Sequence, residues 1–260
     1  MNILVFVKRV PDTESKIKID QATNSIIEEG LNFIISPYDE YAMEEALRIR
    51  EAKGGKVTAV AAGSESSLVI LRKCLAMGAD EAVLLKDPLP ETYDGLRTAR
   101  IIAAFVKAKA PDARLLLFGK QSVGADNSQV PSMVAEFLEM GQANVVVKLE
   151  VGDDSTVAMR EVEGAQEKVV LTLPAVVSAQ KGLNEPRYET LKGILMAKKK
   201  EIPIIPIENL GIKTEDLTPQ IVISRLDLPP GRAAGRVVCG APEETARQLV
   251  EYLHNEAKII

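Results

Sequence analysis

The sequence predicts an α/β fold with a doubly wound, largely parallel sheet, and three observations lead to this prediction. Apolar runs of strand length alternate with segments of helical periodicity up to residue 119, which is typical of βαβ units. After residue 144 the apolar runs follow one another with only short polar turns, which predicts antiparallel additions at one sheet edge. Beyond residue 201 proline and glycine recur so often that an extended C-terminal arm is expected.

The parallel strands are predicted from apolar runs without polar alternation, as expected for strands that are buried on both faces. These runs are residues 3–7, 57–62, 82–85 and 115–118. The antiparallel strands are expected at residues 145–151, 156–162 and 168–173. A small hairpin is expected before the first helix, because residues 16–20 and 24–27 alternate apolar with polar side chains.

Five segments have the spacing of amphipathic helices. Right-handed crossovers should place the helices that alternate with the parallel strands on both faces of the sheet. The first begins at Ser36, the expected N-cap, with Pro37 in its first turn, and ends near Gly54. The inward positions of the next three are Leu68, Leu71 and Leu75; Ile101, Ile102, Phe105 and Val106; and Met133, Val134, Phe137 and Leu138. The fifth helix carries Ala246, Leu249, Val250 and Leu253.

These elements predict two parts of the chain. Residues 1–200 form an α/β nucleotide-binding domain, and residues 201–260 form the arm with its C-terminal helix. An arm that ends in an amphipathic helix has little to pack on within its own domain, so we expect it to lie on another subunit. Packing on its own sheet is the alternative.

Composition excludes several classes of protein. An apolar fraction of 46% supplies a core, and a net charge of −5 gives no reason to expect nucleic-acid binding. Cys74 and Cys239 are too few and too far apart for a disulfide framework, which favours a reducing compartment. No apolar run approaches the roughly 18 residues of a membrane span. We therefore expect a cytoplasmic protein without direct membrane insertion.

Side chains for catalysis or for metal binding do not form a recognisable set. The single histidine, His254, falls in the final helix and is expected in solvent. No Ser-His-Asp, Cys-His or histidine-rich combination can be assembled from the remaining residues. The sequence therefore predicts a carrier subunit without catalytic side chains of its own, whose chemistry belongs to a bound cofactor.

Three loops should meet at one crevice, because ligands of open α/β sheets bind outside the carboxyl ends of the strands. They are residues 8–13, 63–66 and 119–132. The last is rich in Gly, Ser, Asp and Asn and leads into a helix, whose free backbone N–H groups would bind a phosphate. It matches neither the P-loop nor the GxGxxG pattern. We interpret it as a Rossmann-like nucleotide-binding loop, and an ordinary strand-to-helix turn is the alternative.

The segment 183–200 combines an apolar centre with a cationic end. Its apolar residues lack an obvious helix or strand period, and three lysines, Lys198 to Lys200, follow them. Exposed apolar anchors with charges at the rim are typical of a docking loop for an acidic partner. A buried turn followed by solvated lysines is the alternative. The proposed docking residues are Leu191, Ile194, Leu195 and Met196.

Together these motifs resemble the β-subunit family of the electron transfer flavoproteins over essentially the whole chain. The matching stretches are FVKRVPD, SPYDEYAMEEALRIRE, CLAMGAD, GKQ, LPAVVSAQ and LNEPRYETLKGILMAKKK. The resemblance implies a heterodimer with an α subunit, FAD at their interface and AMP buried in this subunit. It also implies that electrons arrive from acyl-CoA dehydrogenase-type flavoproteins and leave to a membrane quinone-linked oxidoreductase.

The resemblance also implies roles for individual residues. Leu191 matches the partner-anchoring leucine, Thr13 lies near the flavin, and Glu161 matches a glutamate that fixes the FAD domain of the α subunit through an ion pair. For Glu161 an ordinary solvated strand residue is the alternative. The nucleotide contacts of the family fall on Phe6, Ser36, Pro37, Tyr38, Asp39, Ala62, Val123, Gly124, Asp126, Asn127, Ser128, Gln129, Val130 and Ser132, with Asp126 and Gln129 the best-matching side chains.

Some positions depart from the usual family pattern. Thr13 stands where mitochondrial members have tyrosine, and Ser128 and Val130 stand where they have Asn and Thr. The stretches 10–13 (VPDT) and 126–130 (DxxQV) resemble electron-bifurcating members, in which a second FAD replaces AMP and NADH is the donor. Pro131 replaces a glycine that is common to both types and lacks an N–H for phosphate. The segments SPYDEYA and 183–200 favour the ordinary, AMP-containing type. A non-redox regulatory protein that binds a nucleotide is the alternative from another class.

Overall fold

The computed structural model describes residues 1–89, 94–231 and 234–260. The chain divides into two compact units, Met1–Arg225 and Leu226–Ile260. The first unit therefore includes the whole predicted nucleotide-binding domain and the beginning of the predicted arm. No helix within the described ranges has the length and apolar character that a bilayer crossing requires.

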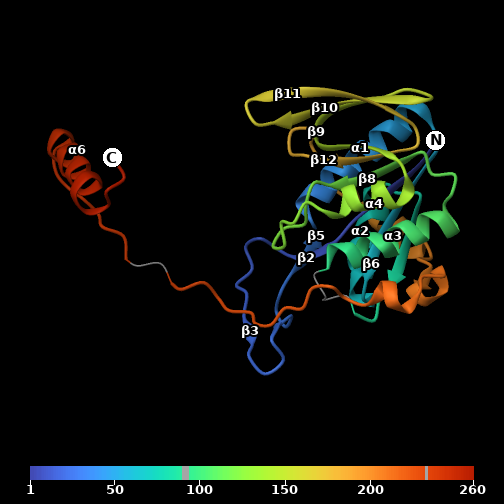
Figure 1. The fold of residues 1–260 in the computed structure, drawn as a ribbon, viewed down its shortest axis with the longest axis horizontal. Helices are drawn as coiled ribbons and strands as arrows, with labels where there is room; N and C mark the ends of the chain where they lie inside the picture. The colour runs from blue at the N-terminus through green and yellow to red at the C-terminus, as the bar shows by residue number, and fades with distance from the viewer. Residues whose placement is uncertain (90–93, 232–233) are drawn as a thin grey trace. The chain divides into compact units, whose positions relative to one another are not determined.

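The main sheet of the first unit confirms the predicted doubly wound α/β fold (Figure 1). Within the described residues it has nine strands in the order β11-β10-β9-β12-β8-β1-β6-β7-β13. All neighbours from β9 to β13 pair in parallel, whereas β9, β10 and β11 pair antiparallel at one edge, as predicted. The strands are β1 (Asn2–Phe6), β6 (Lys56–Gly63), β7 (Glu81–Lys86), β8 (Leu115–Gly119), β9 (Gly141–Val151), β10 (Ser155–Val162), β11 (Ala165–Thr172), β12 (Ala175–Ala179) and β13 (Ile204–Pro206).

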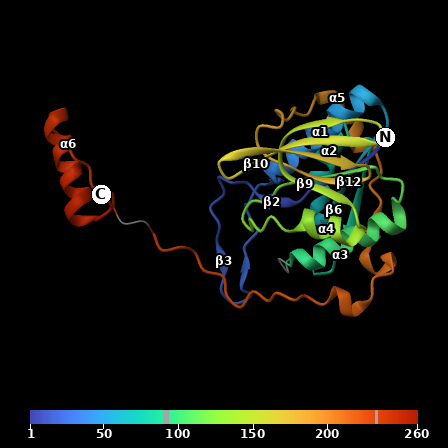
Figure 2. The ribbon, with the colours of Figure 1, turned by 45° about the horizontal axis from the view of Figure 1, so that its top comes forward.

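Helices cover both faces of this sheet. Successive side chains of each strand point to opposite faces, so the domain has two hydrophobic cores. Ile3 and Val5 of β1 belong to one core with α1 and α2, whereas Leu4 and Phe6 belong to a second core with α3 and α4. Figure 2 shows α1 and α2 on one side of the sheet and α3 and α4 on the other. The helices of this unit are α1 (Pro37–Lys53), α2 (Leu68–Met77), α3 (Gly95–Lys109), α4 (Val130–Leu138) and α5 (Leu191–Lys199).

Two small antiparallel pairs lie between β1 and α1, where the sequence predicts a hairpin. They are β2 (Arg9–Pro11) with β5 (Phe33–Ile35), and β3 (Ile19–Asp20) with β4 (Ser25–Ile26). The Arg9 guanidinium lies over the Phe33 ring at 3.2 Å and forms two hydrogen bonds with Glu28, at 2.9 and 3.0 Å. A planar cation that stacks and pairs at once therefore joins the two sides of this excursion near its base.

The second unit contains the predicted C-terminal helix. It is α6 (Pro242–Glu251), continued by a π-helical turn over Tyr252–Glu256. Within this unit the predicted inward residues Leu249 and Val250 are about half exposed, at 49% and 55%. The described residues of the second unit therefore leave Leu249 and Val250 of α6 only partly covered.

Two expectations about helices need correction. Residues 191–199 form the regular helix α5, whereas the sequence predicts a docking loop without regular structure. Ser36 precedes α1, but its side chain does not cap the helix. Its hydroxyl instead accepts a hydrogen bond from the backbone N–H of Val123 at 3.4 Å. Ser36 is fully buried between α1 and the loop after β8, so tertiary contact prevails over the local cap.

Gly119→Ala tests the contact between β8 and α1. A Cβ atom at Gly119 would lie 2.6 Å from the carbonyl carbon of Tyr38 and 2.7 Å from the backbone nitrogen of Asp39. Because backbone atoms must then move, we expect a loss of about 1 to 3 kcal/mol in the free energy of unfolding, measured in urea. Gly231→Ala, where no atom lies within 4 Å, is the control and should change stability by less than about 0.5 kcal/mol. If both substitutions change the free energy of unfolding equally, the close contact between β8 and α1 at Gly119 is contradicted.

Candidate functional site

The three predicted crevice loops begin at the same edge of the sheet. β8, β1 and β6 are neighbours and run parallel, so their carboxyl ends lie side by side. The segments after them are residues 7–13, the turn at 64–67 and the loop at 120–129. This arrangement is the usual position of a ligand in an open α/β sheet.

Asp39 joins the first turn of α1 to two of these strand ends. Its carboxylate accepts the backbone N–H of Lys8 at 2.8 Å and that of Gly119 at 3.0 Å. The side chain is buried, with 6% of the residue exposed. Asp39 thus satisfies two backbone donors that leave the sheet at the crevice, and it fixes α1 over the ends of β1 and β8.

Burial dominates the ionisation of this carboxyl group. It raises the pKa of Asp39 to about 7, although the N–H donors of Lys8 and Gly119 act in the opposite direction. A carboxyl group with a pKa raised in the folded state holds a proton there that the unfolded chain has already lost. The contribution of this group to stability is therefore fully present below about pH 4 and is lost as pH rises through about 7.

The loop after β8 is organised by hydrogen bonds within itself. The side-chain amide of Gln121 donates to Asp126 at 2.7 Å, and its oxygen accepts from the Ser128 hydroxyl at 3.0 Å. Gly124, Asp126 and Ser128 all have positive φ, at 94°, 50° and 51°. Short polar residues tolerate this conformation, so the loop folds tightly without large side chains. Gln121, which the sequence reasoning missed, links the two predicted nucleotide residues Asp126 and Ser128.

The start of α4, at the end of this loop, lacks a side-chain cap. Gln129 is the N-cap residue, its side chain makes no capping hydrogen bond, and Pro131 lies in the first turn. Backbone N–H groups at an uncapped helix start can bind a phosphate, aided by the helix dipole. A Cβ atom added at Gly124 would meet nothing within 4 Å, so the space beside the loop is open. These features fit the phosphate of a nucleotide.

The other predicted nucleotide residues lie in different surroundings. Phe6 is buried and stacks on Phe118 with 4.6 Å between ring centroids, so its ring belongs to the core. The Tyr38 ring lies 5.2 Å from the Lys120 ammonium group beside the loop. Ala62 is half-buried near the end of β6, and Thr13 is exposed after β2. The structure therefore brings Ser36, Pro37, Tyr38, Asp39 and Val123 together, with the remaining loop residues Asn127, Val130 and Ser132 following in the chain.

The apolar docking residues lie on α5, which packs on α2. The Thr190 hydroxyl caps the helix by accepting the N–H of Gly193 at 2.9 Å. Gly193 is close to the end of α2, since a Cβ atom there would lie 3.2 Å from the carbonyl carbon of Ala76. At the other end, Arg72 of α2 donates to the carbonyl oxygens of Ala197 and Lys200. Contacts at both ends therefore fix α5 on the domain.

Exposure separates the four predicted docking residues into two groups. Leu191 is 83% exposed, Leu195 62% and Met196 51%, whereas Ile194 is partly buried against the core of α1 and α2. Leu191 and Leu195 are four residues apart and form one stripe. We call the exposed residues Tyr188, Leu191, Leu195 and Met196 the docking stripe. Tyr188, which is 93% exposed, was not singled out from the sequence, although an exposed aromatic side chain beside an apolar helix is typical of interfaces.

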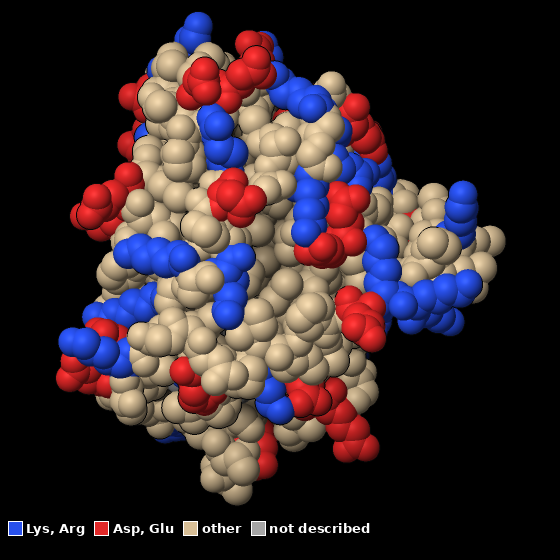
Figure 3. Space-filling view, turned by 90° about the vertical axis from the view of Figure 1, so that its right-hand side faces the viewer, with Lys and Arg blue, Asp and Glu red and all other residues tan. Residues whose placement is uncertain are grey.

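The three lysines after the docking stripe also differ from one another. Lys198 and Lys199 are exposed, whereas the Lys200 ammonium donates to the carbonyl oxygens of Ala79 and Asp80 at 3.0 and 2.8 Å. Lys200 thus holds the end of α5 on the domain, while the other two lysines remain available to a partner. On the face in Figure 3, acidic and basic side chains are interspersed, without a single large field of one sign.

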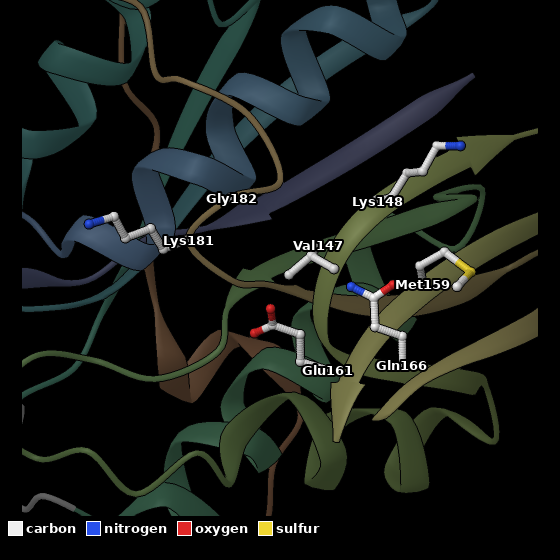
Figure 4. Close-up of a pocket in the computed structure, with 7 residues that line it drawn as sticks. All are labelled: Val147, Lys148, Met159, Glu161, Gln166, Lys181 and Gly182. Atoms are coloured by element: carbon white, nitrogen blue, oxygen red, sulfur yellow. The ribbon is translucent and has the colours of Figure 1, made fainter. Parts of the chain in front are cut away.

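Glu161 lies on the antiparallel edge of the sheet, at the rim of a hollow of about 500 Å³ (Figure 4). It is exposed on β10, directly opposite Gln166 of β11. Lys181 and Gly182 line the hollow from the segment after β12. Figure 4 shows that the Lys181 amino group points away from the Glu161 carboxylate. The Glu161 carboxylate is therefore exposed at the rim of the hollow and does not pair with Lys181.

Comparison with known proteins identifies the family. The electron transfer flavoprotein domain matches residues 23–210. The electron transfer flavoprotein subunit beta of Bacillus subtilis (strain 168) is 41% identical over 262 residues, covering 100% of both chains. The chain belongs to the electron transfer flavoprotein family. Proteins of the same name from Thermoanaerobacterium thermosaccharolyticum and Homo sapiens are 37% and 36% identical, and each alignment covers at least 98% of both chains.

This result confirms the resemblance to electron transfer flavoprotein β subunits that the sequence motifs indicate. The region matched by the family includes the start of α1, the loop after β8 and the docking stripe. It ends before the second unit begins at Leu226. Both candidate sites therefore lie within the part of the chain that the electron transfer flavoprotein domain defines.

Asp39→Asn tests the buried carboxyl group of the crevice. Between about pH 4 and 7 Asp39 should contribute a component of stability that falls as pH rises, because only the folded state still holds the Asp39 proton. An amide does not titrate, so the variant should lack this component, which amounts to about 1.4 kcal/mol per pH unit at most. Urea unfolding of both proteins across this pH range measures the difference. Parallel pH profiles would contradict the assignment.

Proposed function

We propose that this chain is the β subunit of a heterodimeric electron transfer flavoprotein, with FAD at its interface with an α subunit. The main observation in support is the docking stripe, which is a fixed and exposed apolar surface on a chain of this family. Electrons arrive from acyl-CoA dehydrogenase-type flavoproteins and leave to a membrane quinone-linked oxidoreductase. FAD supplies the redox chemistry when bound, and this chain binds, orients and docks rather than catalyses.

The docking stripe fits a partner with an apolar pocket and an acidic rim. Leu191 and Leu195 project from a helix whose position is fixed, so a partner can bury them without ordering a flexible loop. Lys198 and Lys199 are exposed at the end of the helix, where they can attract acidic groups. We propose that the dehydrogenase docks on this stripe. Leu191 is the main anchor, because it is more exposed than Leu195.

Three further features support assembly with an α subunit. The described residues of the second unit leave Leu249 and Val250 of α6 only partly covered, and packing on the α subunit would bury them. The Glu161 carboxylate has the exposure that an ion pair with the FAD domain of the α subunit requires. Thr13, exposed after β2, is proposed to lie near the flavin. We propose that the arm, with α6, packs on the α subunit as a whole.

We propose that the crevice at the start of α1 and α4 binds AMP. The uncapped first turn of α4 can receive one phosphate, and the loop around Gly124 leaves space beside it. Pro131 removes one N–H donor from this turn, which suits a single phosphate better than the pyrophosphate of a second FAD. The bifurcating type, with a second FAD and NADH as donor, is the alternative, since Asp126 and Val130 match its loop.

Nucleotide content distinguishes these two types. The purified complex of this chain and its α subunit, once denatured, should release one FAD and one AMP per heterodimer. Chromatography of the released nucleotides against standards measures both amounts. Release of two FAD molecules and no AMP would contradict the AMP proposal and favour electron bifurcation. A colourless homodimer would contradict the flavoprotein proposal altogether.

Leu191→Ala tests docking. Loss of one exposed anchor should weaken the dehydrogenase complex by about 1 to 3 kcal/mol. Flavin reduction by an acyl-CoA dehydrogenase and its acyl-CoA, followed as loss of flavin absorbance, should therefore show a raised KM for the heterodimer with unchanged FAD content. Leu89→Ala, at a leucine that is 53% exposed outside the docking stripe, is the matched control. An equal loss of FAD in the Leu191 variant would assign the residue a structural role instead.

A further inference from the structure

Arg187 lies in the segment that leads into the docking helix, and it holds two carboxylates of α1. Its guanidinium pairs with both oxygens of Glu44, from Nε at 2.7 Å and from Nη2 at 3.0 Å. The same group reaches Glu51 at 2.5 and 3.1 Å, about two turns further along α1. The Arg187 backbone N–H also donates to Glu44, at 3.2 Å. Five hydrogen bonds therefore join this one residue to α1.

The buried carboxylate of Glu44 depends on Arg187 as its ion-pair partner. The Glu44 side chain is 7% exposed, whereas those of Glu51 and Arg187 are 49% and 32% exposed. A buried carboxylate that loses its partner is strongly destabilising, so the folded protein favours the arrangement in which Arg187 stays in place. Planar, bidentate pairing also restricts the direction in which the chain leaves Arg187.

A neighbouring contact holds the same segment. The Asn184 amide donates to the Tyr41 carbonyl oxygen at 3.0 Å and to Glu45 at 2.9 Å, both on α1. The segment is thus attached to α1 at two points before α5 begins. Thr190, the cap of α5, comes three residues after Arg187, and Leu191 comes four residues after it. Figure 2 shows α5 close to α1 and α2 on the same side of the sheet.

We propose that Arg187 is a positioning residue for partner docking, which fixes Tyr188 and the start of α5 through its pairs with Glu44 and Glu51. The inference rests on the proposed function, since it concerns the surface that the dehydrogenase would contact. Tyr188 directly follows Arg187 and is 93% exposed, so the rest of the domain does not hold its ring. Its place in the docking stripe depends on the backbone that Arg187 fixes.

Preorganisation is the physical effect of this arrangement. A partner that binds a fixed stripe does not have to order the segment on contact. A loosened segment would lose conformational entropy each time a partner bound it, which would weaken docking. Removing Arg187 should therefore weaken docking without altering electron transfer inside the docked complex. In kinetic terms, the KM for the heterodimer rises and kcat stays constant.

Arg187→Gln and Arg187→Lys in the full heterodimer test the proposal, with an acyl-CoA dehydrogenase and its acyl-CoA as reductant. We expect the KM of Arg187→Gln to rise about tenfold, within the range measured for hydrogen-bonded ion-pair networks. Arg187→Lys keeps the charge but loses the planar fork, so its KM should lie between those of the natural and Gln proteins. Lys53→Gln, which removes a cation of α1 that pairs with Asp153, is the matched control.

Combining Arg187→Gln with Leu191→Ala distinguishes a positioning role of Arg187 from a general loss of structure. If Arg187 acts by placing the docking stripe, Leu191→Ala should raise KM less in the Arg187→Gln protein than in the natural one. Independent effects that multiply would overturn the proposal. Unchanged KM in Arg187→Gln, with a raised KM in Leu191→Ala, would overturn it too while leaving the docking function intact. No effect of Leu191→Ala itself would instead contradict the proposed function.

A milder variant covers the case in which Arg187→Gln does not yield a folded heterodimer. Glu51→Gln removes the outer, half-exposed carboxylate and leaves the buried Glu44 pair in place. We expect a rise in KM of about two- to threefold with full FAD content, as for the loss of a partly exposed ion pair. An unchanged KM in this variant would then overturn the proposal.

Discussion

The hydrogen bonds of the buried Asp39 carboxylate are the interaction on which the rest of the structure depends. They fix the first turn of α1 over the ends of β1 and β8. The backbone of α1 comes so close to β8 here that a Cβ atom at position 119 would clash with it. The start of α1 thereby lies beside the loop that is proposed to bind the nucleotide. Further along the same helix, Glu44 and Glu51 hold the segment that leads into α5. One helix therefore sets the position of both candidate sites.

The two sites suit a protein that carries electrons rather than one that transforms a substrate. At the proposed nucleotide site, the uncapped start of α4 and a tight polar loop would bind a phosphate without any acid or base. At the docking stripe, apolar side chains project from a helix that Thr190 caps and Arg72 holds. Rigid presentation of a small apolar surface favours rapid and repeated encounters with a partner, because little has to be ordered on binding.

Periodic patterns predicted most of the fold, and tertiary contacts explain what they missed. The buried strands and the antiparallel edge follow directly from apolar runs and short polar turns. The helix α5 was missed because Gly193 weakens its local propensity, and the close contact with Ala76 that needs this glycine involves a distant helix. Likewise, the sequence placed Asp39 in a first helical turn, but the N–H groups it accepts are known only once β1 and β8 are neighbours.

In the proposed function, the dehydrogenase binds at the docking stripe. Hydrogen exchange of the heterodimer, with and without an acyl-CoA dehydrogenase, tests this claim most directly, because bound surfaces are protected. If the dehydrogenase binds there, backbone amides of residues 188–199 should exchange more slowly in the complex, while those of α4 should be unchanged. Protection elsewhere on the chain, with residues 188–199 exchanging as in the free protein, would contradict it.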